Sequence, residues 1–148
     1  MSQIDTAPDT VTVRVRVTQL LDEFFSRLDR AESVADLLTA NAEFRHGKGR
    51  DAVVELFLGL ARKREEIGRT SRHSTSNITI EELGGGRYRV HSLVVVVSSD
   101  TQPEPQGDLL VADHEDIVEF DAEGACRFVK RVGKPVMKLG GLTVLSLP

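Results

Sequence analysis

Residues 72–80 read Arg-His-Ser-Thr-Ser-Asn-Ile-Thr-Ile, and within this stretch polar, loop-like residues give way to β-branched ones. Such a change is typical of the entry into a β-strand. Because strand side chains alternate between faces, His73 and Asn77 are predicted to share one face, with Ile78 and Ile80 on the other. A face that carries an imidazole, an amide and two threonine hydroxyls suits the wall of a cavity. The alternative is that His73 is a solvated residue at the start of the strand.

The composition indicates one soluble domain. The 148 residues include 28% charged and 40% hydrophobic residues, which is ordinary for a globular chain. The net charge of −4 disfavours nucleic acid as a partner, and a single cysteine, Cys126, excludes an internal disulfide. There is no Cys/His cluster with zinc spacing and no apolar run of the roughly 20 residues that span a membrane. We therefore expect a cytoplasmic protein with no metal, no cofactor, and neither nucleic acid nor membrane as partner.

A first helix is predicted over residues 9–29. Its second half has the spacing of one buried helical face, formed by Val17, Leu20, Leu21, Phe24, Phe25 and Leu28. Residues 10–17 alternate with a period of two, which favours a strand, but we favour one continuous helix. Asp29 ends this helix, where an acid opposes the helix dipole. Its position requires another reason unless it is simply a solvated helix end.

The next segment predicts shorter elements and a second helix. Residues 33–39 fit a short capped helix, and residues 42–46 fit a short strand. Asp51 is predicted to cap an amphipathic helix that ends in the charged run 62–66. Glycines flank Lys48, but no Walker or GxGxxG pattern accompanies them, so a phosphate loop is not predicted.

Antiparallel strands are predicted from residue 72 onward. They cover residues 73–83, 87–99, 108–120 and 125–132. Pro135 is expected to limit the last strand. The four valines of residues 94–97 are apolar on both faces and need a cover on each, from helices or another subunit. On the third strand the even positions form the buried face, so His114 and Asp116 point inward.

Helices followed by hairpin-connected strands indicate the α+β class. We expect three N-terminal helices packed in a strongly curved antiparallel sheet, which forms a cone with a pocket. This domain is expected to cover residues 9–138. A flexible tail precedes it at residues 1–8, and an apolar C-terminal extension follows at residues 139–148. Residues 100–107 are expected to form a mobile loop.

Five short motifs follow one another along the chain. They are Leu28-Asp29, Gly49-Arg50-Asp51-Ala52-Val53, Arg72-His73-Ser74-Thr75-Ser76-Asn77, His114-Glu115-Asp116 and Arg127-Phe128-Val129-Lys130-Arg131. Across residues 9–133 the chain resembles the SnoaL-like branch of the nuclear transport factor 2-like superfamily, whose fold is a cystatin-like α+β cone. Two residues depart from the family pattern. Cys126 stands where the family usually has tryptophan, and His114 stands where it usually has tyrosine.

The resemblance implies a catalytic pair. In several relatives, including dehydratases and a dehydrochlorinase, an acid at the position of Asp29 orients a histidine at the position of His73, which acts as general base. An imidazole can take a proton from an activated carbon while a carboxylate fixes its tautomer and stabilises the imidazolium. The implied function is a cofactor-free lyase or isomerase acting on a small, largely apolar substrate such as a polyketide, steroid-like or aromatic compound. Relatives commonly pair through the sheet, so the resemblance also implies a homodimer.

Further residues are candidates for the pocket. They are Phe24, Asn77, Tyr88, His91, His114 and Asp116. His114 or Asp116 could add a second acid or hold a water, although Asp116 could instead be a structural acid paired with Arg131 or Arg127. His91 could be only a wall residue. Since Tyr88 is the one tyrosine, an enolate would be stabilised by Asn77, by His114 or by backbone N–H groups.

A function of another class is compatible with the same fold, because a fold does not determine a function. The chain could be a non-catalytic ligand-binding or dimerisation module. The enzyme predicts Asp29 and His73 in hydrogen-bond contact at the bottom of an apolar cavity. The binding module predicts a collapsed cavity or these side chains turned outward. The small subunit of a ring-hydroxylating oxygenase shares the fold too, but no motif supports it.

Overall fold

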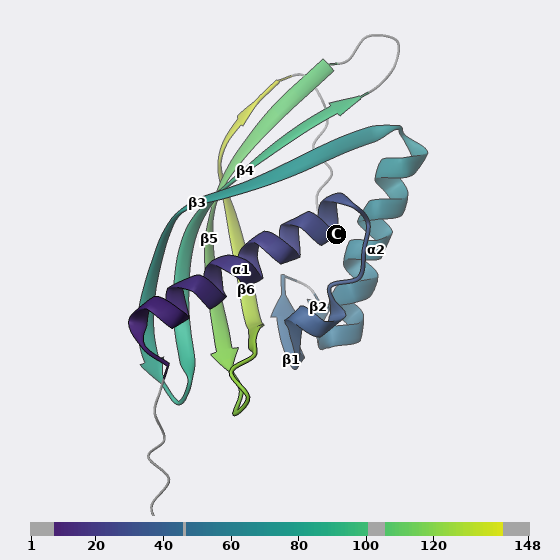
Figure 1. Ribbon diagram of the computed structural model, residues 1–148. Coiled ribbons are helices and arrows are strands. Elements are labelled where there is room, and N and C mark those ends of the chain that lie inside the picture. Colours follow the sequence, from purple (N-terminus) through teal and green to yellow (C-terminus); the bar gives the residue numbers. More distant parts are fainter. Residues whose placement is uncertain (1–7, 46, 101–105, 141–148) are drawn as a thin grey trace, which may run out of the picture.

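The computed structural model describes residues 8–45, 47–100 and 106–140. Over these residues, two α-helices and one 3-10 helix pack against a curved six-stranded sheet (Figure 1). The helices are α1 (Thr10–Asp29), η1 (Ala35–Leu37) and α2 (Arg50–Glu66). The strands are β1 (Leu38–Phe44), β2 (Gly47–Lys48), β3 (Arg69–Gly84), β4 (Arg87–Asp100), β5 (Gln106–Phe120) and β6 (Cys126–Leu139).

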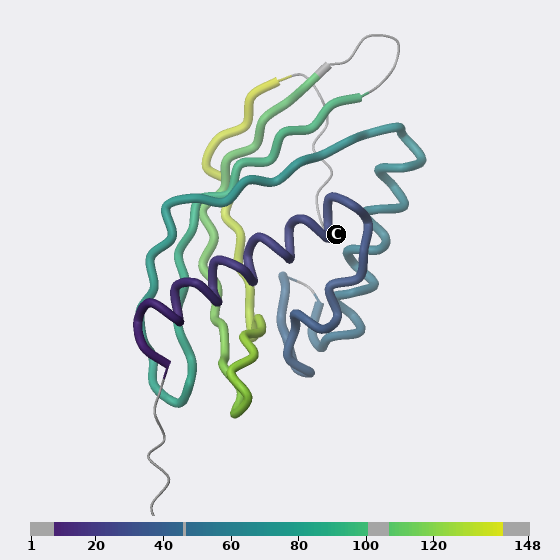
Figure 2. Tube along the Cα trace, viewed as in Figure 1, coloured from purple at the N-terminus to yellow at the C-terminus, as the bar shows by residue number. Residues whose placement is uncertain are grey.

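The sheet has the strand order β2-β1-β6-β5-β4-β3. Neighbouring strands are antiparallel except β1 and β6, which run parallel with Leu38 opposite Phe128. The predicted α+β class with helices inside a curved sheet is confirmed, although the sheet is mixed because β1, from the helical half of the chain, joins the last strand. The four long strands bend together about midway along their length, so that the sheet wraps around α1 (Figure 2).

The first helix supplies much of the core. Asp9 caps it by accepting a hydrogen bond from the Thr12 backbone N–H at 2.8 Å. Its buried stripe consists of Val13, Val17, Leu20, Leu21, Phe24, Phe25 and Leu28. Val11 and Val15, by contrast, are 73% and 50% exposed. The continuous helix is therefore confirmed: burial of one helical face outweighs the β-branched alternation of residues 10–17.

Two predictions for the region between the helices are wrong. Residues 33–39 do not form a capped helix, because only Ala35–Leu37 are helical and β1 starts at the fully buried Leu38. The second helix is preceded by Gly49, whose φ of 90° is readily adopted only by glycine, and Asp51 lies in its first turn instead of capping it.

The last strand is longer than predicted. β6 continues past Pro135 to Leu139. Its pairing with β5 shifts at a bulge, so that Pro135 faces Ala112 while Met137 faces Val111. β1 pairs with β6 only as far as Arg131, so Pro135 lies beyond that pairing and next to the bulge, two settings in which a strand tolerates proline.

A bulge in β3 changes which side chains share a face. Asn77 has a φ of 54°, and the pairing with β4 shifts between Ser76 and Thr79. Beyond the bulge, Ile78 and Ile80 pack against the core, while Asn77 is exposed. The predicted alternation is therefore wrong here, since an irregular residue resets the period of two.

Parts of three predictions lie outside the described residues: the tail at residues 1–8, the loop at residues 100–107 and the apolar extension at residues 139–148. The same holds for His46 of the predicted strand at residues 42–46. None of the helices in the described ranges is long and apolar enough to cross a membrane. In the valine run, Val94 is buried but Val97 is 51% exposed, and cover for that outer face by a second subunit stays a prediction.

Candidate active site

Asp29 and His73 lie 44 positions apart in the sequence and are in direct contact. His73 Nδ1 is 2.6 Å from Asp29 Oδ1, and the His73 backbone N–H donates to Asp29 Oδ2 at 3.0 Å. Their side chains are only 15% and 10% exposed. Because a carboxylate only accepts, this network assigns the proton to Nδ1 and leaves the lone pair on Nε2. The two hydrogen bonds from β3 also explain why an acid is tolerated at the end of α1.

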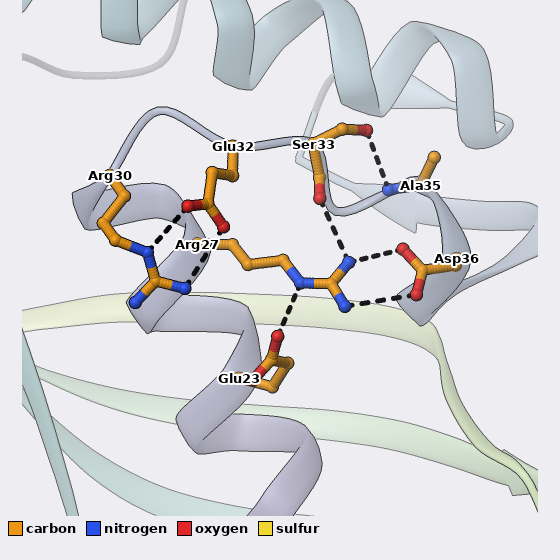
Figure 3. A network of polar contacts seen from close by, with 7 residues as sticks. All are labelled: Glu23, Arg27, Arg30, Glu32, Ser33, Ala35 and Asp36. Carbon is orange, nitrogen blue, oxygen red and sulfur yellow. Dashed lines mark hydrogen bonds and ion pairs between the residues drawn. The ribbon is translucent and has the colours of Figure 1, made fainter.

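Polar contacts hold the end of α1 in place (Figure 3). Arg27 donates to Glu23 one turn earlier, to the carbonyl of Ser33 and to both oxygens of Asp36. These bonds join the last turn of the helix to η1, so they restrain the position from which Asp29 projects.

A cavity of about 370 Å³ lies beside the pair, between the two α-helices and the concave face of the sheet. Its walls are mainly aromatic and aliphatic side chains, among them Phe24, Phe44 and Phe57, and it also contains His73, His114 and Arg131. A smaller hollow of about 150 Å³ shares the wall at His73 and extends to Ser71 and Ser98. An apolar space with a few convergent polar groups is typical of a ligand site.

Phe25 contacts both histidines of the cavity, His73 and His114. Its ring stacks on His73 with centroids 4.8 Å apart and an interplanar angle of 15°, and it lies edge-on to His114 at 6.2 Å. The sequence identified Phe25 only as part of a buried helical face. Its spacing of four from Asp29 was the available signal, because such residues share one side of a helix.

Arg131 is a site residue that the sequence suggested only as a possible partner of Asp116. It is 3% exposed, and its Nε and Nη2 donate to the two oxygens of Asp116 at 2.7 and 3.0 Å. The guanidinium lies 4.4 Å from the Phe128 ring centroid and 4.6 Å from that of Phe24. Burial raises the pKa of Asp116, and the Arg131 charge opposes that rise. Asp116 is thus placed as a structural acid beneath the cavity, and it does not line it.

One nitrogen of Arg131 has no hydrogen-bond partner in the described part of the chain. Among the described residues, Nη1 is buried without a hydrogen-bond partner, and Arg131 lines the cavity. A buried donor that lacks a partner costs free energy, which an acceptor on a ligand would recover.

His114 lies on the cavity face of β5, opposite Gly133. Burial, followed by the charge of Arg131, lowers its pKa from 6.5 to about 3, so it is neutral at pH 7. Arg131 Nη2 lies 3.4 Å from its Nδ1 and can only donate, which leaves the proton on Nε2. His114 is therefore a neutral N–H donor at neutral pH, and an imidazolium acid is not formed there.

Solved structures resemble this chain over most of its length. A scytalone dehydratase candidate from Novosphingobium aromaticivorans DSM 12444 matches with a TM-score of 0.75 at 21% identity, over 95% of this chain and 97% of that one. The hexachlorocyclohexane dehydrochlorinase LinA type 2 matches with 0.73 at 15% identity, over 93% and 95%. The chain has the SnoaL-like, nuclear transport factor 2-like fold.

ActVI-ORFA from Streptomyces coelicolor shares this SnoaL-like fold, with a TM-score of 0.66 at 18% identity over 83% of this chain and 97% of that one. No family model matches the chain, and no curated protein matches it in sequence. At these identities the likeness concerns the fold.

Besides Asp116, three further predicted pocket residues lie outside the cavity of this cone. Asn77 is exposed because of the β3 bulge. His91 occupies the convex face of β4, where its side chain is 51% exposed and lies 3.8 Å from Glu115. Tyr88 is buried further along β4 against Phe120. These placements correct the sequence prediction, whereas Phe24 and His114 do line the cavity.

Within the described ranges, no three His, Cys, Asp or Glu side chains come together as the ligands of a metal do.

The low pKa of His114 predicts acid sensitivity. Between pH 6.5 and about 3 the unfolded state binds a proton that the folded state does not, so stability falls as the pH falls. At pH 5 this one group is expected to lower the free energy of unfolding by about 2 kcal/mol relative to pH 7. Urea denaturation at both pH values should show a smaller loss for His114→Gln than for the wild type. His91→Gln should keep the wild-type loss, and equal losses in the two variants would contradict the assignment.

Gly133 leaves room for the His114 ring. A Cβ at Gly133 would lie 2.8 Å from His114 Nε2, so Gly133→Ala is expected to displace the ring and cost about 1–3 kcal/mol of unfolding free energy. Gly59 of α2 is the control, because a Cβ there meets nothing within 4 Å and Gly59→Ala should gain about 0.5–1 kcal/mol. Urea denaturation measures both, and a neutral Gly133→Ala would show that the ring is not held there.

Proposed function

We propose that this protein is a cofactor-free lyase or isomerase in which His73 removes a proton from an activated carbon of a small, largely apolar substrate. The observation that carries the proposal is the contact of His73 Nδ1 with Asp29 at 2.6 Å beside an apolar cavity that His73 lines. The names of similar structures, a dehydratase candidate and a dehydrochlorinase, agree with this class of reaction.

The first step is a proton transfer. His73 Nε2 takes the proton of a carbon next to a carbonyl group, and Asp29 stabilises the imidazolium that forms. The C–H electron pair moves toward the carbonyl oxygen, which becomes an enolate. In this proposal the neutral Nε2–H of His114 donates to that oxygen, and Arg131 turns its buried, unpartnered Nη1 toward it.

The second step determines the product. In a dehydration the electron pair of the enolate forms a C=C bond, the hydroxyl on the neighbouring carbon leaves with its bonding pair, and the proton held by His73 converts it to water. In an isomerisation the same proton returns to a different carbon. Both routes restore neutral His73, so neither needs a cofactor.

The substrate is proposed to be a polyketide-type, steroid-like or aromatic compound. Flat ring systems suit walls that contain Phe24, Phe44 and Phe57. The volume of about 370 Å³ is in the range of small-molecule sites.

The test uses ring compounds with a β-hydroxyketone or an acidic C–H group, incubated with the protein in D₂O. Proton NMR follows the loss of water and the exchange of the carbon-bound proton. We expect turnover with the wild type and with His91→Ala, whose imidazole lies on the convex face, and loss of turnover with His73→Gln. Turnover that survives in His73→Gln would contradict the proposal, and saturable binding without turnover would favour a ligand-binding module.

A further inference from the structure

The charged side chains that line the cavity are of one sign, and the Asp29 carboxylate lies behind His73. Arg45, Arg131 and Lys138 line the larger space, and Arg64 and Arg69 line the smaller hollow next to it. Among the described residues, no Asp or Glu lines either space, although the whole chain has 23 acidic against 19 basic residues. The site is therefore electropositive in a protein of net charge −4.

Two of these cations already have partners. Arg131 is paired with Asp116, and Arg69 Nε lies 3.2 Å from Asp100. Asp108 faces inward at the outer end of β5, but it packs against Gly140 and lines neither space.

The other three cations have no carboxylate partner in the part of the chain that the structure describes. Arg64 donates to the Leu28 carbonyl at 2.7 Å, and burial lowers its pKa while the charge of Asp29 opposes that change. Arg45 and Lys138 are exposed while lining the larger cavity, so they lie where it meets solvent.

The position of Lys138 results from the β6 bulge. Lys134 faces the exposed Asp113 across the ladder, on the convex side. In a regular strand Lys138, four positions later, would share that side. The extra residue at the bulge instead places it opposite Leu110, which lines the cavity. Bulges commonly redirect a side chain beside a functional site.

We infer that the substrate of this site is an anion, a carboxylate attached to an apolar ring system, with Lys138 binding the carboxylate while the rings occupy the cavity. The inference rests on the proposed function and narrows its substrate class. Arg131 agrees with an anionic ligand, because its Nη1 is buried without a partner among the described residues. A second negative charge or an acceptor oxygen on the ligand would satisfy that donor.

The test compares two ligands of similar size and shape, one an anion and the other neutral. Isothermal titration calorimetry measures the binding of 2-naphthoate and of its neutral amide, 2-naphthamide, to the wild type. We expect naphthoate to bind at least about tenfold more tightly at low salt. The preference should shrink in about 0.3 M NaCl, because exposed charges are screened.

Two lysine variants test whether Lys138 binds the carboxylate. Lys138→Gln is expected to weaken naphthoate binding about fivefold and to leave naphthamide binding unchanged. Lys134→Gln removes the same charge from the same strand on the convex side and should leave both affinities unchanged. Equal affinities for the two ligands, equal effects of the two variants, or no binding of either ligand would each overturn the inference.

The outcomes separate this inference from the proposed function. His73→Gln should keep the preference for naphthoate, because the base does not hold the carboxylate. If turnover depends on His73 but neutral substrates bind as well as anionic ones, only the anion inference fails. If naphthoate is preferred but turnover does not depend on His73, only the proposed reaction fails.

Discussion

His73→Gln is expected to lower kcat by about 10²- to 10⁴-fold, the range that a positioned general base contributes. Glutamine cannot accept a proton, yet its backbone N–H still donates to Asp29 and its side chain is of similar size. The fold should therefore be retained, and KM should change little. The effect is measured by steady-state kinetics on a substrate that the D₂O experiment identifies. Circular dichroism checks that the variant is folded.

The matched control is His91→Gln, which removes an imidazole from the convex face. Wild-type kcat in this variant together with a large loss in His73→Gln would assign the base. A similar loss in both, or in neither, would rule His73 out as the base. Asp29→Asn is informative as well, because an asparagine amide can donate and so permits the wrong imidazole tautomer.

Asp116→Ala is expected to have the largest effect on stability. It leaves the guanidinium of Arg131, 3% exposed, without its two charge-assisted hydrogen bonds among phenylalanine rings. Breaking a buried ion pair from one side costs about 3–5 kcal/mol. Urea denaturation should show this loss in the free energy of unfolding.

The double variant Asp116→Leu/Arg131→Met tests the reason for that loss. It removes both charges and keeps apolar volume, so it should recover most of the stability. A loss below about 1 kcal/mol in Asp116→Ala, or no recovery in the double variant, would contradict the pairing as the cause. The double variant should nevertheless turn over slowly, because it also lacks the Nη1 donor that the mechanism uses.

Local periodicity predicted the elements whose burial is regular. The i, i+3, i+4 spacing predicted the buried face of α1, and the period of two predicted that His114 and Asp116 lie on the inner face of β5. These predictions succeeded because each concerns a single regular helix or strand that buries one side in the core.

The prediction for Asn77 failed where a backbone irregularity broke the period, because the bulge in β3 turns Asn77 away from the cavity. The bulge in β6 likewise turns Lys138 toward the cavity, and the sequence analysis made no prediction for that residue. A bulge is determined by the pairing with the neighbouring strand and by the bending of the whole sheet, and no pattern within either strand marks it.

Short-range spacing of apolar residues was enough to predict the α+β class, the extent of α1 and the inward-facing positions of β5. The sequence motifs, through their resemblance to a family, also suggested Asp29 and His73 as a pair. The fold was needed to show that these two meet at 2.6 Å, that Phe25 stacks on the imidazole and that one nitrogen of Arg131 is buried without a partner among the described residues. Such contacts join residues that are distant in sequence, so they exist only once the sheet has closed around α1.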